Sequence, residues 1–164
     1  METINHEYYV SLEVAKLLKE AGFDWPTLYS YDLYSTEGEM RVIDGFASIC
    51  NEHNKFASMP TLEIAQRWLR VVKDYCVSVV ADCDSSGIYY TVRIIYYDTN
   101  INNYYATHVW EETKLERAKH RLIFNNYEEA QEAGIKKTLE IILEKGKGEF
   151  IINYNDNIKY VEML

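Results

Sequence analysis

The residues from Asp82 to Gly87 come nearer to a metal-binding motif than any other segment of this sequence. They read D-C-D-S-S-G, which matches the first half of a calcium-binding loop, where carboxylate and hydroxyl oxygens hold the ion. Such a loop also requires a bidentate carboxylate at its twelfth position, and that position is Arg93. Because strands rather than helices are expected on both sides, we interpret the segment as a polar hairpin turn with Gly87 at positive φ.

The histidines and cysteines form no recognisable zinc-binding or catalytic pattern. His108 and Glu112 are four residues apart, which would place them on one face of a helix, and we interpret them as a surface pair. The three cysteines, Cys50, Cys76 and Cys83, include no CxxC pair, so we expect three reduced thiols. HExxH, GxSxG, P-loop and GxGxxG motifs are absent from the sequence. We therefore predict no cofactor, no metal and no catalytic residue, while a catalytic site assembled only in the fold stays open.

The stretch from Tyr9 to Asp32 is the strongest motif for nucleic-acid binding. It reads YVSLEVAKLLKEAGFDWPTLYSYD and looks like the start of a helix-turn-helix, with a recognition helix beginning at T-L-x-x-Y-D. No Lys or Arg occurs between Lys19 and Arg41, whereas five acidic residues do. Cations that neutralise phosphates supply almost all non-specific affinity for DNA. DNA binding is therefore an alternative that the charges disfavour, and nucleic acid is not the expected partner.

Length and composition favour one acidic domain. The 164 residues are 48 % hydrophobic and carry a formal net charge of −9, so we expect a single domain over 1–164 with a hairpin appendage at 147–164. The charge argues against a general polyanion binder and favours solubility or a basic protein partner. The sequence shows neither a signal peptide nor a membrane-spanning segment, which predicts the cytoplasm of a bacterial host and no contact with a membrane.

Three segments carry apolar residues at helical spacing and are predicted to be helices: 11–22, 62–72 and 127–145. Ser11, Thr61 and Asn126 are the expected N-caps. In the second helix we expect a buried stripe of Ala65, Trp68, Leu69 and Val72. The residues expected to face water are Glu63, Gln66, Arg67 and Arg70. A short helix is also suggested within 111–122, where the pattern is ambiguous.

Alternating apolar and polar residues predict strands. We expect a hairpin of 28–34 with 39–43, a central hairpin of 75–82 with 88–97, a strand at 104–110 and a last hairpin within 150–161. Residues 44–58 show no period and are predicted to be loop. Together these helices and strands predict an α+β fold, in which about three helices pack mainly on one face of an antiparallel sheet.

Tyrosine is abundant, with fifteen residues in the chain, and much of it falls on the central strands. On the strand 88–97, the even-numbered residues from Ile88 to Tyr96 are predicted to face the core. The outward set is Tyr89, Thr91, Arg93, Ile95 and Tyr97. Because three helices cannot cover both faces of the sheet, we predict that this set is an interaction surface. A homodimer is the simplest closed assembly that such a surface can form. A tyrosine-rich sheet covered within the chain is the alternative.

One basic cluster precedes the third helix. It consists of Lys114, Arg117, Lys119 and Arg121. Glutamates are interleaved with these cations, as is typical of a solvated helix face. A small patch for an acidic partner is the alternative interpretation.

Three segments together resemble small uncharacterised proteins encoded by phages and prophage-like elements of gut Bacteroidales. They are VSLEVAKLLKEAGFDWP, MPTLEIAQRWLR and NNYEEAQEAGIKKTLEIIL, and the resemblance covers about half the chain. It implies a genomic setting and no particular activity. The first segment also resembles the N-terminal half of MerR-type regulators, which continue into Arg-Tyr-Tyr where this chain has Tyr29-Ser30-Tyr31.

The leading functional hypothesis is a non-enzymatic accessory protein of a phage or mobile element that acts by binding a protein partner or a second copy of itself. It depends on the tyrosines, the acidic balance and the lack of site motifs. A helix-turn-helix regulator and an enzyme with a site assembled only in the fold are the alternatives.

Overall fold

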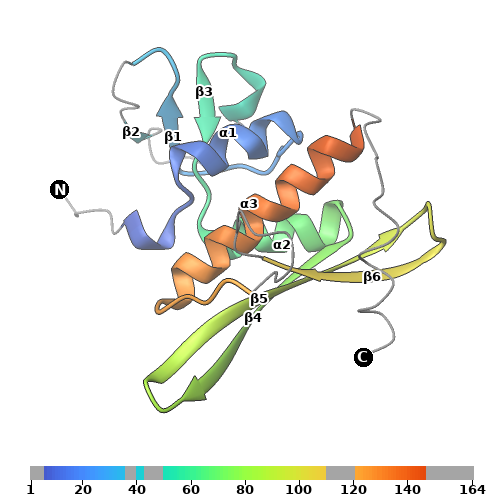
Figure 1. Cartoon of the computed structure of the whole chain (residues 1–164). Coiled ribbons are helices and arrows are strands. Elements are labelled where there is room, and N and C mark those ends of the chain that lie inside the picture. Colours follow the sequence, from blue (N-terminus) through green and yellow to red (C-terminus); the bar gives the residue numbers. More distant parts are fainter. Residues whose placement is uncertain (1–5, 36–39, 43–49, 110–120, 147–164) are drawn as a thin grey trace.

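The computed structural model describes residues 6–35, 40–42, 50–109 and 121–146 (Figure 1). These residues form three α-helices, six β-strands and two short 3-10 helices, at His6–Tyr8 and Cys50–Glu52. Two antiparallel sheets are present, which confirms the α+β class but divides the strands between two sheets where one was expected. The predicted short helix within 111–122 and the C-terminal hairpin at 147–164 fall mainly or wholly outside the described residues. None of the described helices is both long enough and apolar enough to cross a membrane.

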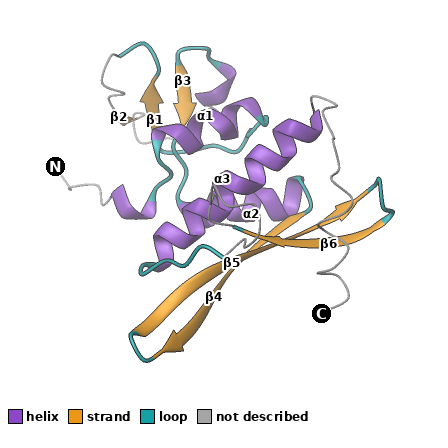
Figure 2. Ribbon diagram, in the orientation of Figure 1, coloured by secondary structure: helices purple, strands orange, loops and turns teal. Residues whose placement is uncertain are grey.

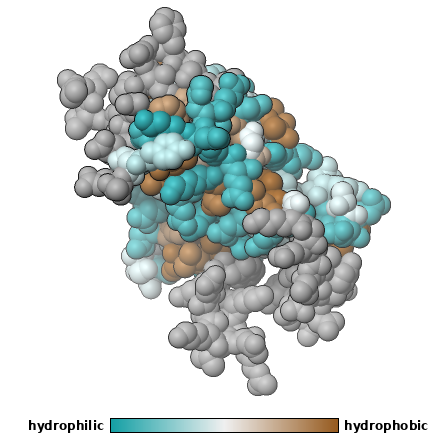
Figure 3. Space-filling model, turned by 90° about the horizontal axis from the view of Figure 1, so that it is seen from above, coloured by the Kyte–Doolittle hydropathy of each residue, from teal (hydrophilic) through white to brown (hydrophobic). Residues whose placement is uncertain are grey.

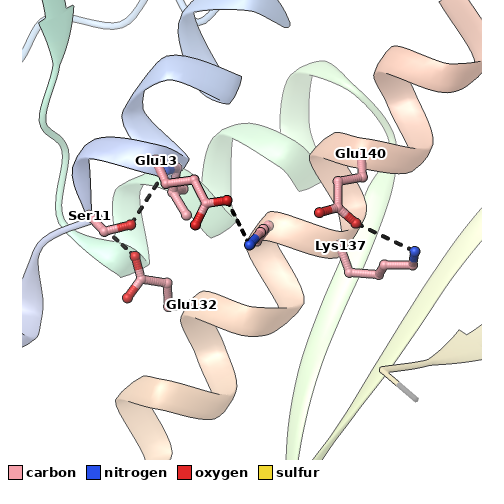
Figure 4. A network of polar contacts seen from close by, with 7 residues as sticks. Ser11, Glu13, Glu132, Lys137 and Glu140 are labelled. Atoms are coloured by element: carbon pink, nitrogen blue, oxygen red, sulfur yellow. Dashed lines mark hydrogen bonds and ion pairs between the residues drawn. The ribbon is translucent and has the colours of Figure 1, made fainter. Parts of the chain in front are cut away.

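Helix α1 (Leu12–Glu20) begins and ends where the sequence predicted. The Ser11 hydroxyl accepts a hydrogen bond from the Val14 amide at 3.4 Å, as an N-cap does, and Gly22 follows the helix at a φ of +85°. A hydrogen bond and an ion pair join the start of α1 to α3 (Tyr127–Gly146), which crosses the molecule beside it. The Ser11 amide donates to Glu132 Oε1 at 2.7 Å, and a second link is the ion pair between Glu13 and a lysine of α3 (Figure 4).

Strand β1 (Tyr29–Asp32) is the centre of the smaller sheet, between β2 (Met40–Val42) and β3 (Phe56–Ser58). The predicted hairpin of β1 with β2 is confirmed. The interpretation of 44–58 as loop was wrong at its end, because β3 pairs with the other edge of β1. A three-residue strand carries no measurable period, so only its partner defines it. The position where a recognition helix would begin is therefore a strand.

Helix α2 (Leu62–Val72) starts at the predicted N-cap, with the Thr61 hydroxyl accepting from the Ile64 amide at 3.3 Å. Leu62 and Trp68 are among its fully buried side chains. Two predictions for this helix were wrong. Val72, its last residue, is 47 % exposed. Gln66 is half-buried and does not simply face water, because its amide nitrogen donates to the Val77 carbonyl at 2.6 Å.

The larger sheet has the strand order β4 (Tyr75–Asp84), β5 (Gly87–Asp98), β6 (Asn103–His108), each antiparallel to its neighbour. The central hairpin and the following strand were both predicted. Figures 1 and 2 show that the β4–β5 hairpin projects beyond the helices as an arm. At the tip of the arm Gly87 has a φ of +133°, and the Asp84 carboxylate accepts from the Ser86 amide at 2.7 Å. The segment that matched half a calcium loop is thus the predicted hairpin turn.

Helix α3 (Tyr127–Gly146) lies across the inner side of the larger sheet, between it and α1 (Figure 1). Asn126 is its N-cap and accepts from the amides of Glu128 and Glu129. A Cβ built at Gly134 would lie 2.6 Å from a methyl carbon of Val77 and 2.6 Å from one of Val92. Glycine at this position therefore lets the helix approach the sheet closely. The core continues from this contact through α2 to α1 and the smaller sheet.

Candidate interaction surface

The two sides of β5 differ in exposure as alternation predicted. Val92, Ile94 and Tyr96 are buried against the helices, whereas Arg93 and Ile95 are half-buried on the other side. The predicted register is therefore confirmed over this central part. It fails at the arm, where Ile88 was expected inside and is 67 % exposed. The reason is tertiary, because the arm extends past the helices that cover the rest of the strand.

We call the side of the larger sheet turned away from α3 the outer face. Cross-strand partners project from the same face, so the register defines its members. Ser78, Arg93 and His108 form one row across the three strands. The outer face consists of Cys76, Ser78, Val80, Asp82 and Asp84 on β4, Tyr89, Thr91, Arg93, Ile95 and Tyr97 on β5, and Tyr104, Ala106 and His108 on β6. All of these residues keep some solvent exposure.

Toward the arm, the outer face is acidic. Asp82 is paired across the strands with Tyr89, and Asp84 follows at the turn. Desolvation and then these two carboxylates raise the pKa of Tyr89. Hydrogen bonds from Ser86 lower the pKa of Asp84, so this carboxylate is charged at neutral pH. Every residue from Ala81 to Ile88 is exposed, which places the two charges at the surface.

The centre of the outer face is basic. Arg93 lies in the middle strand, and its Nε is buried without a hydrogen-bond acceptor among the described residues. His108 is its partner on β6. Burial, then the charges of Arg121 and Arg93, lower the pKa of His108, which shows that the three groups share one neighbourhood. Within two positions of Arg93 on the described outer face there is no carboxylate.

Beyond the basic centre, the outer face ends in aromatic residues. Tyr97 and Tyr104 are cross-strand partners whose rings meet edge to face, with centroids 5.4 Å apart. The Tyr97 hydroxyl donates to Asn102 at 2.6 Å, and Tyr104 is 66 % exposed. Tyrosines with an apolar ring and a solvated hydroxyl are enriched where proteins meet.

The predicted interface residues are thus brought together, and the structure adds members that sequence reasoning missed. Asp82 and His108 belong to the same face through the register of β4 and β6. Strand alternation would have located both once the hairpin turns were counted. His108 lies at the end of β6, so it is not on a helical face as its spacing from Glu112 suggested. Glu112 is outside the described residues, and the interpretation of the two as a surface pair stays a prediction. Of the basic cluster, only Arg121 is described, and it is exposed.

Seen from above, from the side of α1 and the smaller sheet, apolar residues reach the surface in patches separated by polar ones (Figure 3). Within the described ranges, no group of three His, Cys, Asp or Glu side chains is placed to hold a metal ion. None of the three cysteines forms a disulfide: Cys50 is buried, Cys76 half-buried and Cys83 exposed near the tip of the arm.

Comparison of the chain with protein-family models, with curated proteins and with solved structures found no match in any of the three. The resemblance to phage-encoded proteins of gut Bacteroidales therefore stays a prediction.

Proposed function

We propose that this is a non-enzymatic accessory protein of a phage or mobile element, active in the cytoplasm of its bacterial host through protein–protein binding. The outer face of the larger sheet is the proposed contact surface. The observation that carries the proposal is the asymmetry of that sheet. Helices bury Val92, Ile94 and Tyr96 on the inner side of β5. Ile95, Tyr97 and Tyr104 on the outer side keep part of their apolar surface in water.

The composition of the outer face supports a protein ligand in preference to a small molecule. The face is spread over three strands and combines aromatic rings, β-branched side chains and separated charges of both signs. Such a mixture is typical of protein interfaces, in which an apolar centre excludes water and charges set the orientation. DNA is not favoured by this face, since its basic groups are few and the same face carries the carboxylates of Asp82 and Asp84.

Photo-crosslinking in cells tests the proposal without assuming which protein binds. A benzophenone amino acid placed at Tyr104 on the outer face should give covalent products with one defined protein. The matched control places the same amino acid at Tyr34, which is 72 % exposed but lies outside this face. Equal crosslinking at the two positions, or none at Tyr104, would contradict the proposal.

A further inference from the structure

We infer that the outer face is self-complementary and that its occupant is a second copy of this chain, with Arg93 of each copy placed on Asp82 of the other. The inference rests on the proposed function, because it assumes that the outer face binds protein. Three observations carry it: the arrangement of charges along the strands, the unpartnered nitrogen of Arg93, and the size of the face.

The charges are spaced symmetrically about one level of the sheet. Asp82 is the cross-strand partner of Tyr89, which lies two residues before Thr91 on β5. Arg93 lies two residues after Thr91 on the same strand. At about 3.3 Å per residue, the acidic and basic rows are therefore about 13 Å apart. Val80 is the partner of Thr91, so the midpoint between the rows is uncharged.

A two-fold axis brings these rows together when two outer faces are stacked. The axis lies between the two faces, runs perpendicular to the strands and passes at the level of Thr91. The rotation reverses the strand direction, so the basic row of each copy lies on the acidic row of the other, as an isologous interface requires. Sheets that pack face to face are about 10 Å apart, a gap that an arginine and an aspartate side chain can bridge together. Two chains that each carry a net charge of −9 would thus meet through opposite local charges.

Arg93 is the group that most needs such a contact. Its Nε is buried and has no acceptor among the described residues. A buried donor without an acceptor is costly, and a carboxylate can accept two parallel hydrogen bonds from a guanidinium. The nearest described residues of the face, among them Ser78, Ile95 and Ala106, offer no carboxylate. Arg93 as a whole is only half-buried, so a second copy would bring Asp82 to the part of this residue that stays at the surface.

The size of the face indicates a weak dimer. Ten residue pairs join β4 to β5 and six join β5 to β6, so two strands run together for about 33 Å and the third for about 20 Å. At about 5 Å of width per strand, the flat area is roughly 430 Å². Stable interfaces bury about 800 Å² of accessible surface on each partner. We therefore expect self-association at tens to hundreds of micromolar, concentrations at which sedimentation equilibrium can measure it.

Charge exchange between Arg93 and Asp82 provides the test. Sedimentation equilibrium of the full chain is compared with Arg93→Asp, Asp82→Arg and the double variant. Each single variant should weaken the dimer by at least about tenfold, since it places like charges together, and the double variant should recover it. Arg70→Asp is the matched control, because Arg70 is exposed on α2, and it should leave the dimer unchanged. Circular dichroism confirms that each variant is folded.

A monomeric unmodified chain at hundreds of micromolar, or a folded double variant that does not recover, would overturn the inference. The crosslinking experiment separates this result from failure of the proposed function. Products between Tyr104 and a foreign protein would keep the proposed function, and the same products from a benzophenone amino acid at Thr91, on the two-fold axis, would replace the second copy as occupant. Products only within one chain, with residues 110–120 or 147–164, would overturn both.

Discussion

Ile94 and Ile95 are neighbours on β5 and have opposite surroundings. Ile94 has no exposed surface and lies among residues of the core, whereas Ile95 is half-buried on the outer face. Both faces of the sheet are rich in tyrosine and β-branched residues, so composition does not distinguish them. The difference is that α3 packs on the inner face and meets the strands so closely at Gly134. A sequence rich in strand-forming residues therefore shows that a sheet exists, and the helices decide which side becomes core.

Charged groups on the two faces also differ in their partners. On the inner face Asp98 is buried and continues the even-numbered series of β5. Lys145, from the last turn of α3, is 3.5 Å from its carboxylate and 4.0 Å from the centre of the Tyr96 ring. The buried Asp98 carboxylate therefore has a cation from within the chain, whereas the buried Nε of Arg93 on the outer face has no hydrogen-bond acceptor among the described residues.

The largest expected effect comes from truncating the two neighbouring isoleucines. Ile94→Ala should lower the free energy of unfolding by about 2–5 kcal/mol, because it removes buried methyl groups and leaves a cavity. Ile95→Ala should cost less than about 1 kcal/mol, since its side chain stays partly in water in the single chain. Urea denaturation at low protein concentration measures both. Equal losses would show that the outer face is as well covered as the inner one.

A smaller loss is expected at the closest approach of α3 to the sheet. Gly134→Ala should destabilise the protein by about 1–3 kcal/mol, because the new methyl group would meet Val77 and Val92 and force them apart. In an open helix the same change would be stabilising by about 1 kcal/mol. Thermal unfolding distinguishes the two outcomes, and a raised midpoint would contradict the close contact. Gly146→Ala is a control, since a Cβ there meets nothing within 4 Å.

Alkaline pH should weaken the inner face selectively. Desolvation, and then the Asp98 carboxylate, raise the pKa of Tyr75 from 10.0 to about 12, and the pKa of Tyr96 is raised as well. Tyrosine ionises earlier in the unfolded chain, so this stability is complete below pH 10 and is lost as the pH rises toward 12. Denaturation at stepwise pH, with tyrosinate absorbance of the folded protein, measures it. Ionisation of all tyrosines in one step near pH 10 would contradict the prediction.

Thiol labelling compares the exposure of three sites without any change to the sequence or to the stability of the protein. Cys83 near the arm tip should react first, Cys76 on the outer face more slowly, and buried Cys50 at least about a hundredfold more slowly than Cys83 because it must await local opening. Mass spectrometry of timed samples resolves the three sites. If a second copy covers the outer face, the rate at Cys76 should fall as the protein concentration rises, while the rate at Cys83 serves as an internal control. Cys76 labelling at a rate independent of concentration would indicate that the outer face is not covered in this way.

Features that depend on a few neighbouring residues were predictable from the sequence. The N-caps at Ser11, Thr61 and Asn126 are satisfied by amides two or three residues away, so the helix starts follow from local chemistry. The central hairpin and the two sides of β5 follow from alternation, because successive side chains on a strand must point in opposite directions.

Features that depend on contacts between distant segments were decided only by the tertiary structure. Strand β3 exists because β1 offers a free edge, and the strands separate into two sheets because α1 and α3 lie between them. Ile88 is exposed because the arm extends beyond the helices, although Ile88 and buried Ile94 occupy equivalent positions in the alternating pattern of β5. The register likewise assembles Asp82, Arg93 and His108 into one face from three strands. Local pattern determines which way a side chain points, and only packing determines what it meets there.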